Sequence, residues 1–393
     1  MAKLIDITGK ALSGEWGTDD ESGSGIPVLR TTNFTNEGVV NYNNVVTRTI
    51  SKKNIDEKYL CPGDIIIEKS GGSDKQPVGR VIYYDGPEKT YLFNNFTGLL
   101  RVKNKSRWHP RYVFYSLYSN YRKGGTREYE NKTTGLHNLK TDAYVSRYEV
   151  ADASFFHQKQ ICEHLDIIAG IIRLRQQELQ KLDDLIKARF VEMFGDPEAG
   201  TCRYGTKKLG ELSVKISDGV HAKPNYTETG RPFLSVVNIN KGIVDFTDCK
   251  YVSEEAYKKM IKSTHPENGD VLYTKVGATY GIPAYVDTDK EFCLYVSVCL
   301  IKPKHERINA RFLSIQMGMP SIKHQADARI KGIGVPDLHL NQIREFNIIC
   351  PPRASQDEFV AFVDQVDKSK AQVQKALDET RLLFDSLMQE YFG

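Results

Sequence analysis

Residues 158–194, QKQICEHLDIIAGIIRLRQQELQKLDDLIKARFVEMF, decide how this chain is organised. Apolar residues recur at alternating steps of four and three, which is typical of a coiled-coil seam rather than of one face of a globular helix. The stretch contains no proline and predicts a helix of about 55 Å. Gly195-Asp196-Pro197 predicts its end, because glycine favours the C-cap and proline cannot continue a helix. The apolar positions of this seam are Ile161, Leu165, Ile168, Ile172, Leu179, Leu182 and Ile186.

A second stretch, Gln356–Phe392, repeats the pattern 198 positions later. The polar interruptions differ, since Arg175 corresponds to Val373 and Lys370 to Ile172. Two equivalent but unequal helices predict one antiparallel pair within the chain; the alternative is that each long helix packs on a separate core. The apolar positions of the second seam are Phe359, Val363, Val366, Val373, Leu377, Phe384 and Leu387.

The rest of the chain also repeats. Gly63–Gly71 returns as Gly269–Gly277, and Pro27-x-Leu29-x-x-x-Asn33 returns at Pro232 to Asn238. Short β-type runs such as Val271–Thr274 and a helical run at Arg111–Tyr121 predict an α+β fold, with two similar mixed α/β domains and a pseudo-twofold repeat. The predicted order is a first recognition domain at 1–152, a central helix at 153–200, a second recognition domain at 201–352 and a C-terminal helix at 353–393.

Composition is that of an ordinary globular protein. The 393 residues are 40% hydrophobic and 26% charged, with a net charge of +4, which by itself is weak evidence for nucleic acid binding. Seven cysteines without a C-x-x-C pair predict reduced thiols in a cytoplasm rather than a disulfide framework or a zinc site. No apolar run is long enough to predict a membrane span.

Catalytic motifs are missing from the sequence. It contains no phosphate loop, no H-E-x-x-H and no Asn/Asp-Pro-Pro-aromatic tetrad of amino-group DNA methyltransferases. Asp64-x-x-x-Glu68 is loosely similar to a nuclease site, but its counterpart carries Thr274 in place of the glutamate. A structural strand and turn is therefore the better interpretation, and no catalytic or metal-binding residue is predicted.

Two kinds of segment suit DNA phosphates or bases. Both domains keep Lys-x-Gly-[Gly/Ala]-[Ser/Thr], a glycine turn beside a lysine that holds a phosphate or is merely a solvated turn. Two predicted loops interleave basic residues with glycines, aromatics and amides, which suits gripping of a DNA backbone. Their candidate DNA-binding residues are Lys69, Ser73, Lys275 and Thr279 in the turns, and Arg122, Lys123, Arg127, Lys323, Gln325, Arg329 and Lys331 in the basic loops.

A third segment differs between the domains. The loop between Gly14 and Pro27 is acidic, whereas the equally long loop between Gly219 and Pro232 is basic and aromatic. Divergent loops on one scaffold are what two readers of different sequences require. The candidate DNA-binding residues in the second loop are His221, Lys223 and Tyr226.

With these features the chain resembles the specificity subunit of a Type I restriction–modification system over its full length. The resemblance is carried mainly by the Gln158-x-x-Ile161-x-x-x-Leu165-Asp166 start of the central helix and by its Met193-Phe194-Gly195-Asp196-Pro197 end. It implies a non-catalytic subunit that binds a bipartite, asymmetric site in double-stranded DNA and holds two methylation subunits. It further implies that S-adenosylmethionine is bound by those partners, which methylate adenine at N6, and that a restriction and translocase subunit joins for cleavage.

Two alternatives remain at this point. A coiled-coil adaptor whose repeated domains bind proteins would show no salt-dependent affinity for DNA. A nuclease using Asp64 and Glu68 would cleave DNA on its own in the presence of a metal.

Overall fold

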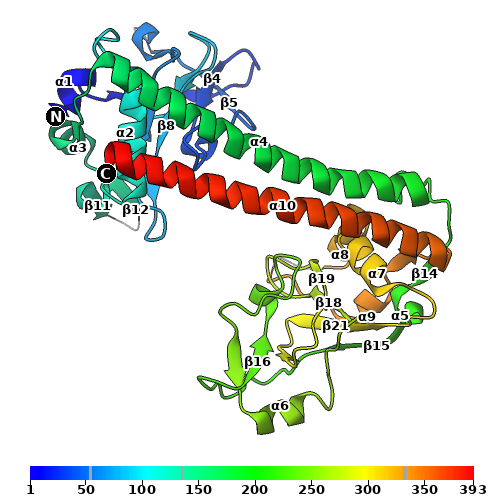
Figure 1. The fold of residues 1–393 in the computed structure, drawn as a ribbon. Helices are drawn as coiled ribbons and strands as arrows, with labels where there is room; N and C mark the ends of the chain where they lie inside the picture. Colours follow the sequence, from blue (N-terminus) through cyan, green and yellow to red (C-terminus); the bar gives the residue numbers. More distant parts are fainter. Residues whose placement is uncertain (53–54, 134–135, 331–333) are drawn as a thin grey trace. The chain divides into compact units, whose positions relative to one another are not determined.

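The chain folds into two compact units, and each unit contains part of both long helices (Figure 1). The computed structural model describes residues 1–52, 55–133, 136–330 and 334–393. Unit 1 comprises Met1–Gln176 and Lys375–Gly393, and unit 2 comprises Gln177–Gln374. The predicted boundaries between domains and helices follow secondary structure instead, and they stay predictions. None of the helices in the described part of the chain has the length and apolar character of a membrane span.

The two long helices match their predicted ranges closely. Helix α4 covers Phe155–Phe194 and α10 covers Arg353–Phe392, so each begins three residues earlier than predicted. As predicted, α4 ends before Gly195, whose φ of 86° lies in the left-handed region that favours glycine.

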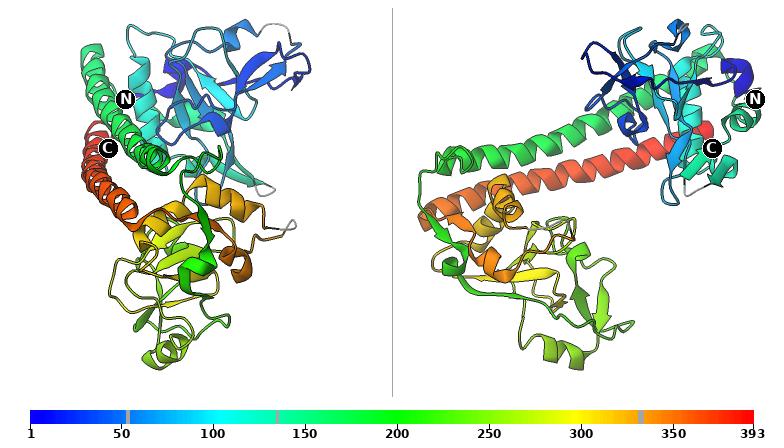
Figure 2. Two further views of the ribbon diagram at one scale, coloured as in Figure 1. Left: turned by 90° about the vertical axis from the view of Figure 1, so that its right-hand side faces the viewer. Right: turned by 180° about the vertical axis from the view of Figure 1, so that it is seen from behind.

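Within each unit the two helical segments run antiparallel and lie side by side (Figure 2). In unit 1, His164 contacts the hydroxyl of Tyr391, and Arg175 donates to Ala376 and Thr380 further along. In unit 2, Lys370 donates to Asp183 over 2.5 Å. The charged interruptions of both seams therefore meet polar groups rather than apolar ones, which avoids an unpaired buried charge.

All of the predicted apolar seam positions are removed from full exposure. Seven are buried and the others are half-buried. The buried ones are Ile161, Leu165, Phe359, Val363, Val366, Leu377 and Phe384, and the half-buried ones are Ile168, Ile172, Leu179, Leu182, Ile186, Val373 and Leu387.

In the residues that the structure describes, the globular part of unit 1 mixes short strands with three α-helices, as an α+β fold predicts. One sheet has the order β2-β10-β6-β8, and a second, β3-β5-β4-β9, contains one parallel pair, β4 with β9. The helices are α1 Leu4–Thr8, α2 Pro110–Arg122 and α3 Thr141–Arg147; the strands are β1 Ala2–Lys3, β2 Leu12–Ser13, β3 Thr18–Asp19, β4 Ile26–Leu29, β5 Val46–Thr49, β6 Ile65–Glu68, β7 Ser70–Gly72, β8 Val81–Tyr83, β9 Leu92–Phe93, β10 Thr97–Leu100, β11 Glu130–Thr133, β12 Leu136–Leu139 and β13 Glu149–Val150.

The globular part of unit 2 has the corresponding sheet order, β15-β21-β18-β19, and again one parallel pair, β16 with β20. The helices are α5 Leu209–Leu212, α6 Glu254–Met260, α7 Ala310–Met317, α8 Pro320–Asp327 and α9 Leu340–Arg344; the strands are β14 Thr206–Lys208, β15 Ser213–Asp218, β16 Arg231–Leu234, β17 Lys250–Val252, β18 Val271–Thr274, β19 Pro283–Tyr285, β20 Cys293–Leu294, β21 Val298–Pro303 and β22 Asn347–Ile349.

Helices α2 and α7 carry each globular part onto its long helices. In unit 1 one continuous core contains Tyr112 and Tyr115 of α2 together with Ile161 and Leu165 of α4. In unit 2 the rings of Phe190, Phe194, Phe312 and Phe359 pack together in the same way. Burial of large aromatic side chains makes these contacts the main attachment between domain and helices.

Helices α2 and α7 begin with different caps. The Asn309 side chain accepts from the backbone N–H groups of Arg311 and Phe312 at the start of α7. His109 stands at the equivalent place before α2, provides no side-chain cap, and buries an Nδ1 that has no hydrogen-bond partner in the structure.

Replacing His109 with asparagine is expected to raise the stability of unit 1 by about 1 kcal/mol, because it supplies the missing cap. Burial lowers the pKa of His109 from its ordinary 6.5, so below that pH the unfolded chain takes up a proton that the folded chain refuses. The stability of unit 1 therefore decreases as the pH is lowered below about 6.5. Asparagine does not titrate, so the gain in stability from His109→Asn should be larger near pH 5.5 than near pH 7.5. Hydrogen exchange of α2 amides at both pH values measures this gain in stability. A gain that is the same at both pH values, or a loss of stability, would contradict the interpretation that His109 leaves α2 without a cap.

Two local predictions were wrong. Residues 320–327 form helix α8 rather than a loop, with Pro320 at the first helical positions, where its missing N–H is not needed. Residues 70–72 form strand β7, paired with β12, rather than a free glycine turn. In both cases the local sequence pattern is ambiguous, and packing against distant parts of the chain determines the secondary structure of the segment.

Candidate nucleic-acid interface

The first basic segment is directed at helix α10. Arg122 donates to Asp385 over 2.6 Å, and Lys123 donates to the carbonyl of Phe392 over 3.0 Å. Arg127 donates to the carbonyl of Asp74. These cations therefore already serve contacts within unit 1, and their predicted role in DNA binding stays a prediction.

The second basic segment is similarly engaged inside unit 2. Lys323 lies 3.9 Å from the centre of the Tyr280 ring and pairs with Asp327. Gln325 exchanges two hydrogen bonds with the backbone of Asn347, which extends the edge of β22. Arg329 donates to the carbonyls of Gln325 and Glu345. Lys331 lies outside the described residues.

The Lys-x-Gly motif differs between the units. In unit 1, Lys69 donates to Ser13 over 2.9 Å, and burial lowers the pKa of its ammonium group. Ser73 is exposed, and its hydroxyl accepts from the backbone of Gln76. This arrangement leaves Ser73, rather than Lys69, at the surface.

In unit 2 the lysine of the motif is internal. Lys275 is only 5% exposed, and its ammonium lies 3.5 Å from Asp218 and 3.4 Å from Asp337. Thr279 is exposed at the end of the turn, and its carbonyl accepts from the Thr274 hydroxyl. Lys275 therefore neutralises two carboxylates, which is a structural role in the described fold.

The loop before β16 gathers the predicted basic and aromatic residues at the surface. Lys223 lies 6.0 Å from the centre of the Tyr226 ring, and Lys250 of strand β17 lies 4.3 Å from it. His221 is exposed beside Asp218. An aromatic ring flanked by two ammonium groups can contact a base or sugar with its face while the lysines contact phosphates.

Unit 1 carries a related pair with different chemistry. Trp16, in the loop before β4, is covered by the guanidinium of Arg48 from strand β5 at 4.2 Å. Arg48 also pairs with Asp19. Asp20 accepts hydrogen bonds from Ser22 and Gly25, and hydrogen bonding, led by the one with Thr47, lowers its pKa to about 2. This loop presents carboxylates, which accept from base amino groups and repel phosphates.

The strand cations at these loops escaped the sequence analysis. Arg48 and Lys250 lie 32 and 24 residues beyond the aromatic residues that they cover, on the strand paired with β4 or β16. Only the pairing of antiparallel strands brings them to the loop. The alternation of apolar and polar residues in β5 and β17 was the sequence signal that could have paired these strands with β4 and β16, and so have placed Arg48 and Lys250 at the loops.

The nuclease-like carboxylates serve the fold. Both oxygens of Asp64 accept from Arg101, at 2.7 and 2.6 Å, and Asp64 is 1% exposed. Glu68 lies beside Arg80, and burial raises the pKa of Glu68. Among the described residues no group of three or more histidine, cysteine or acidic side chains is placed to hold a metal ion.

The sequence is similar to known DNA specificity proteins. Residues 204–380 match the family model described as the Type I restriction modification DNA specificity domain. The chain is 21% identical over 377 residues to the Type I restriction enzyme EcoKI specificity subunit of Escherichia coli (strain K12), covering 86% of this chain and 75% of that protein.

The fold is also similar to solved structures. The Type I restriction–modification S subunit from M. genitalium superposes with a TM-score of 0.51 at 16% identity, over 100% of this chain and 95% of that one. A chain from a study of complex assembly and conformational transition of the type I R-M system gives 0.53 at 15% identity, over 100% and 96%. At these identities the likeness concerns the fold.

Proposed function

We propose that this chain, which belongs to the family of Type I restriction–modification specificity subunits, selects the DNA sequence on which its system acts and is not itself catalytic. Each globular part reads one half of a bipartite, asymmetric site in double-stranded DNA. The two long helices pair as an antiparallel coiled coil about a pseudo-twofold axis. The antiparallel contacts within each unit and the corresponding sheet orders support this arrangement.

The observation that carries the proposal is the pair of corresponding loops before β4 and β16. Both present an aromatic ring covered by a cation from the neighbouring strand, Trp16 with Arg48 and Tyr226 with Lys250. The surrounding side chains differ, acidic in one loop and basic in the other. A shared frame with different polar groups supports recognition of two different half-sites.

The partners follow from the family. The chain holds two methylation subunits that bind S-adenosylmethionine and methylate adenine at N6, and a restriction and translocase subunit joins for cleavage. The complex works in the cytoplasm. Apolar side chains of α4 and α10 that stay exposed in unit 1 support a docking surface for the methylation subunits: Ile167, Ile171, Leu174, Leu382 and Leu383.

The function is tested by expressing the chain with its methylation subunit and mapping methylated adenines across the host genome. A single motif made of two different half-sites with a fixed gap is the expected result. A coiled-coil adaptor would leave the genome unmethylated and would show no salt-dependent affinity for random duplex DNA.

Replacing Lys223 and Lys250 with alanine is expected to weaken DNA binding and to lower the slope of log affinity against log salt by up to about two, one for each lost phosphate contact. Titration of duplex DNA at several salt concentrations measures both. The matched control replaces Lys258 and Lys259 of α6, which already pair with Glu254 and Glu255. An unchanged slope in the first variant would remove the β16 loop from the interface.

A further inference from the structure

Each globular part is joined to the start of a long helix by a buried glutamine. Gln158 lies in the first turn of α4 and Gln356 in the first turn of α10, at equivalent places in the repeat. Both are completely buried, although glutamine is usually a surface residue. A buried amide at the same place in both units calls for an explanation in hydrogen bonding.

Each glutamine makes three hydrogen bonds to backbone. The Gln158 oxygen accepts from the N–H of His109 over 2.8 Å, and its nitrogen donates to the carbonyls of Arg107 and Ala153. The bonds tie the helix start to the turn that begins α2. The chain segments that meet here are far apart in sequence, since His109 and Gln158 are 49 positions apart.

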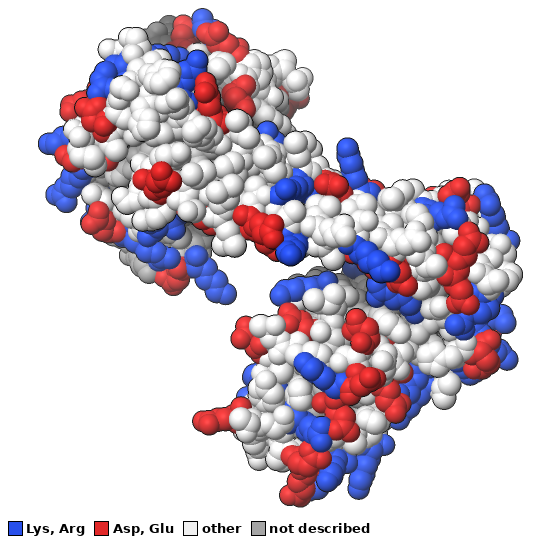
Figure 3. Space-filling view, in the orientation of Figure 1, with Lys and Arg blue, Asp and Glu red and all other residues white. Residues whose placement is uncertain are grey.

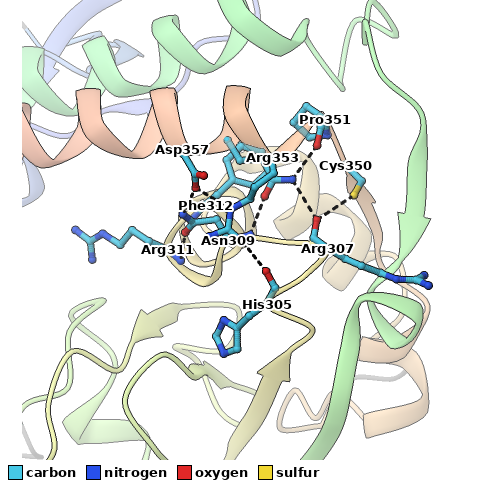
Figure 4. A network of polar contacts seen from close by, with 10 residues as sticks. His305, Arg307, Asn309, Arg311, Phe312, Cys350, Pro351, Arg353 and Asp357 are labelled. Carbon is cyan, nitrogen blue, oxygen red and sulfur yellow. Dashed lines mark hydrogen bonds and ion pairs between the residues drawn. The ribbon is translucent and has the colours of Figure 1, made fainter.

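Gln356 repeats this arrangement in unit 2. Its oxygen accepts from the N–H of Asn309 over 2.8 Å, and its nitrogen donates to the carbonyls of Arg307 and Pro351 (Figure 4). Only a primary amide both accepts one bond and donates two in this space. Glutamate would lack both donors, and methionine would fill the volume without any of the three bonds.

Beyond these joints, each unit has a cleft between domain and helices. In unit 1 the cleft has a volume of about 680 Å³ and lies between Arg111 of α2 and Gly170 of α4. In unit 2 a cleft of about 470 Å³ lies beside Arg311 of α7. Each domain therefore does not pack against the whole length of its helix segments. The contacts at the helix start, with the buried glutamine among them, thus help to set the angle between the domain and its helices.

We propose that Gln158 and Gln356 are positioning residues that fix the angle of each recognition domain on its helices, and thereby the number of base pairs between the two half-sites. This inference rests on the proposed function. Neither glutamine side chain is expected to contact DNA, because both are buried. They act through the backbone of the turns before α2 and α7.

The two joints are unequal, which gives the proposal a ranked outcome. In unit 2, Asp357 also accepts from Asn309 over 2.7 Å and from Arg353 over 2.8 Å (Figure 4). In unit 1 the corresponding place holds a ring contact between His109 and Phe155, 5.9 Å between centres. Unit 1 therefore depends more on its glutamine, and the loss of Gln158 should have the larger effect.

The experiment maps methylated motifs in cells that express the full chain with its methylation subunit, using wild type, Gln158→Met and Gln356→Met. Both variants are expected to keep the wild-type half-sites and to methylate sites whose gap is one base pair longer or shorter, about tenfold or more above wild type, with Gln158→Met the more permissive. Leu99→Ala is the control, since it opens a core of unit 1 that does not contact the long helices.

Three outcomes distinguish the proposed function from the positioning role of the two glutamines. A wild-type chain that yields no bipartite motif overturns the proposed function, and this inference with it. A bipartite motif in wild type, with an unchanged single gap in the glutamine variants, overturns only the inference. An equal relaxation of the gap in Leu99→Ala overturns it too, because general loss of stability would then suffice. If Gln158→Met does not fold, Gln356→Met decides, since its joint keeps the bonds from Asp357.

Discussion

Replacing Ile167 and Leu174 together with glutamate is expected to abolish stable association of the chain with the methylation subunit that we propose as its partner. The two side chains are 62% and 64% exposed on α4, although both are large and apolar. They stand seven positions apart, so they share one side of the helix. In Figure 3 much of the surface over this part of the molecule is white, with single charged side chains scattered across it.

The physical reason is the cost of enclosing a carboxylate in an apolar contact. An unpaired charge buried at an interface costs several kcal/mol, and about 1.4 kcal/mol already changes affinity tenfold. Folding of the isolated chain should be almost unaffected, because exposed substitutions usually change stability by within about 0.5 kcal/mol.

Co-purification and titration with the methylation subunit measure the effect, together with the melting temperature of the chain alone. Val214→Glu with Val335→Glu is the matched control, since these valines are exposed to a similar degree outside the long helices. Unchanged affinity in the Ile167 and Leu174 variant would show that the partner docks elsewhere.

Replacing Phe359 with alanine is expected to destabilise unit 2 by about 3–5 kcal/mol. Its ring is fully buried, with ring centres of Phe190, Phe194 and Phe312 at 5.6, 5.5 and 5.9 Å. Alanine leaves a cavity where α10, α4 and α7 meet, and the stacked rings around it lose their edge-to-face contacts.

Hydrogen exchange of α7 and of the start of α10 should report this loss, because a chain of two units need not unfold in one step. Phe359→Leu keeps most of the apolar volume and should cost clearly less. A cost below about 1 kcal/mol for alanine would mean that the cluster does not attach the domain to its helices.

The sequence by itself determined the features that depend on local periodicity. The alternating apolar steps gave both long helices to within three residues at their starts, and Gly195 marked the end of α4. A helical run at Arg111–Tyr121 and a β-type run at Val271–Thr274 were predicted too, and they form α2 at Pro110–Arg122 and β18 at Val271–Thr274. Helix and strand periods are set by neighbours a few positions apart, so they can be read directly from the chain.

Only the tertiary structure decided which side chains meet. Arg122 pairs with Asp385, 263 positions away, Lys275 is enclosed between two carboxylates, and Lys250 covers Tyr226 through strand pairing. Such contacts join positions that are far apart in the sequence, so they require the closure of long loops. The residues next to each partner therefore give almost no indication of which distant side chain it will meet. The seam marked Arg175 as a polar interruption, but only the register of the folded helices brought it to Ala376 and Thr380.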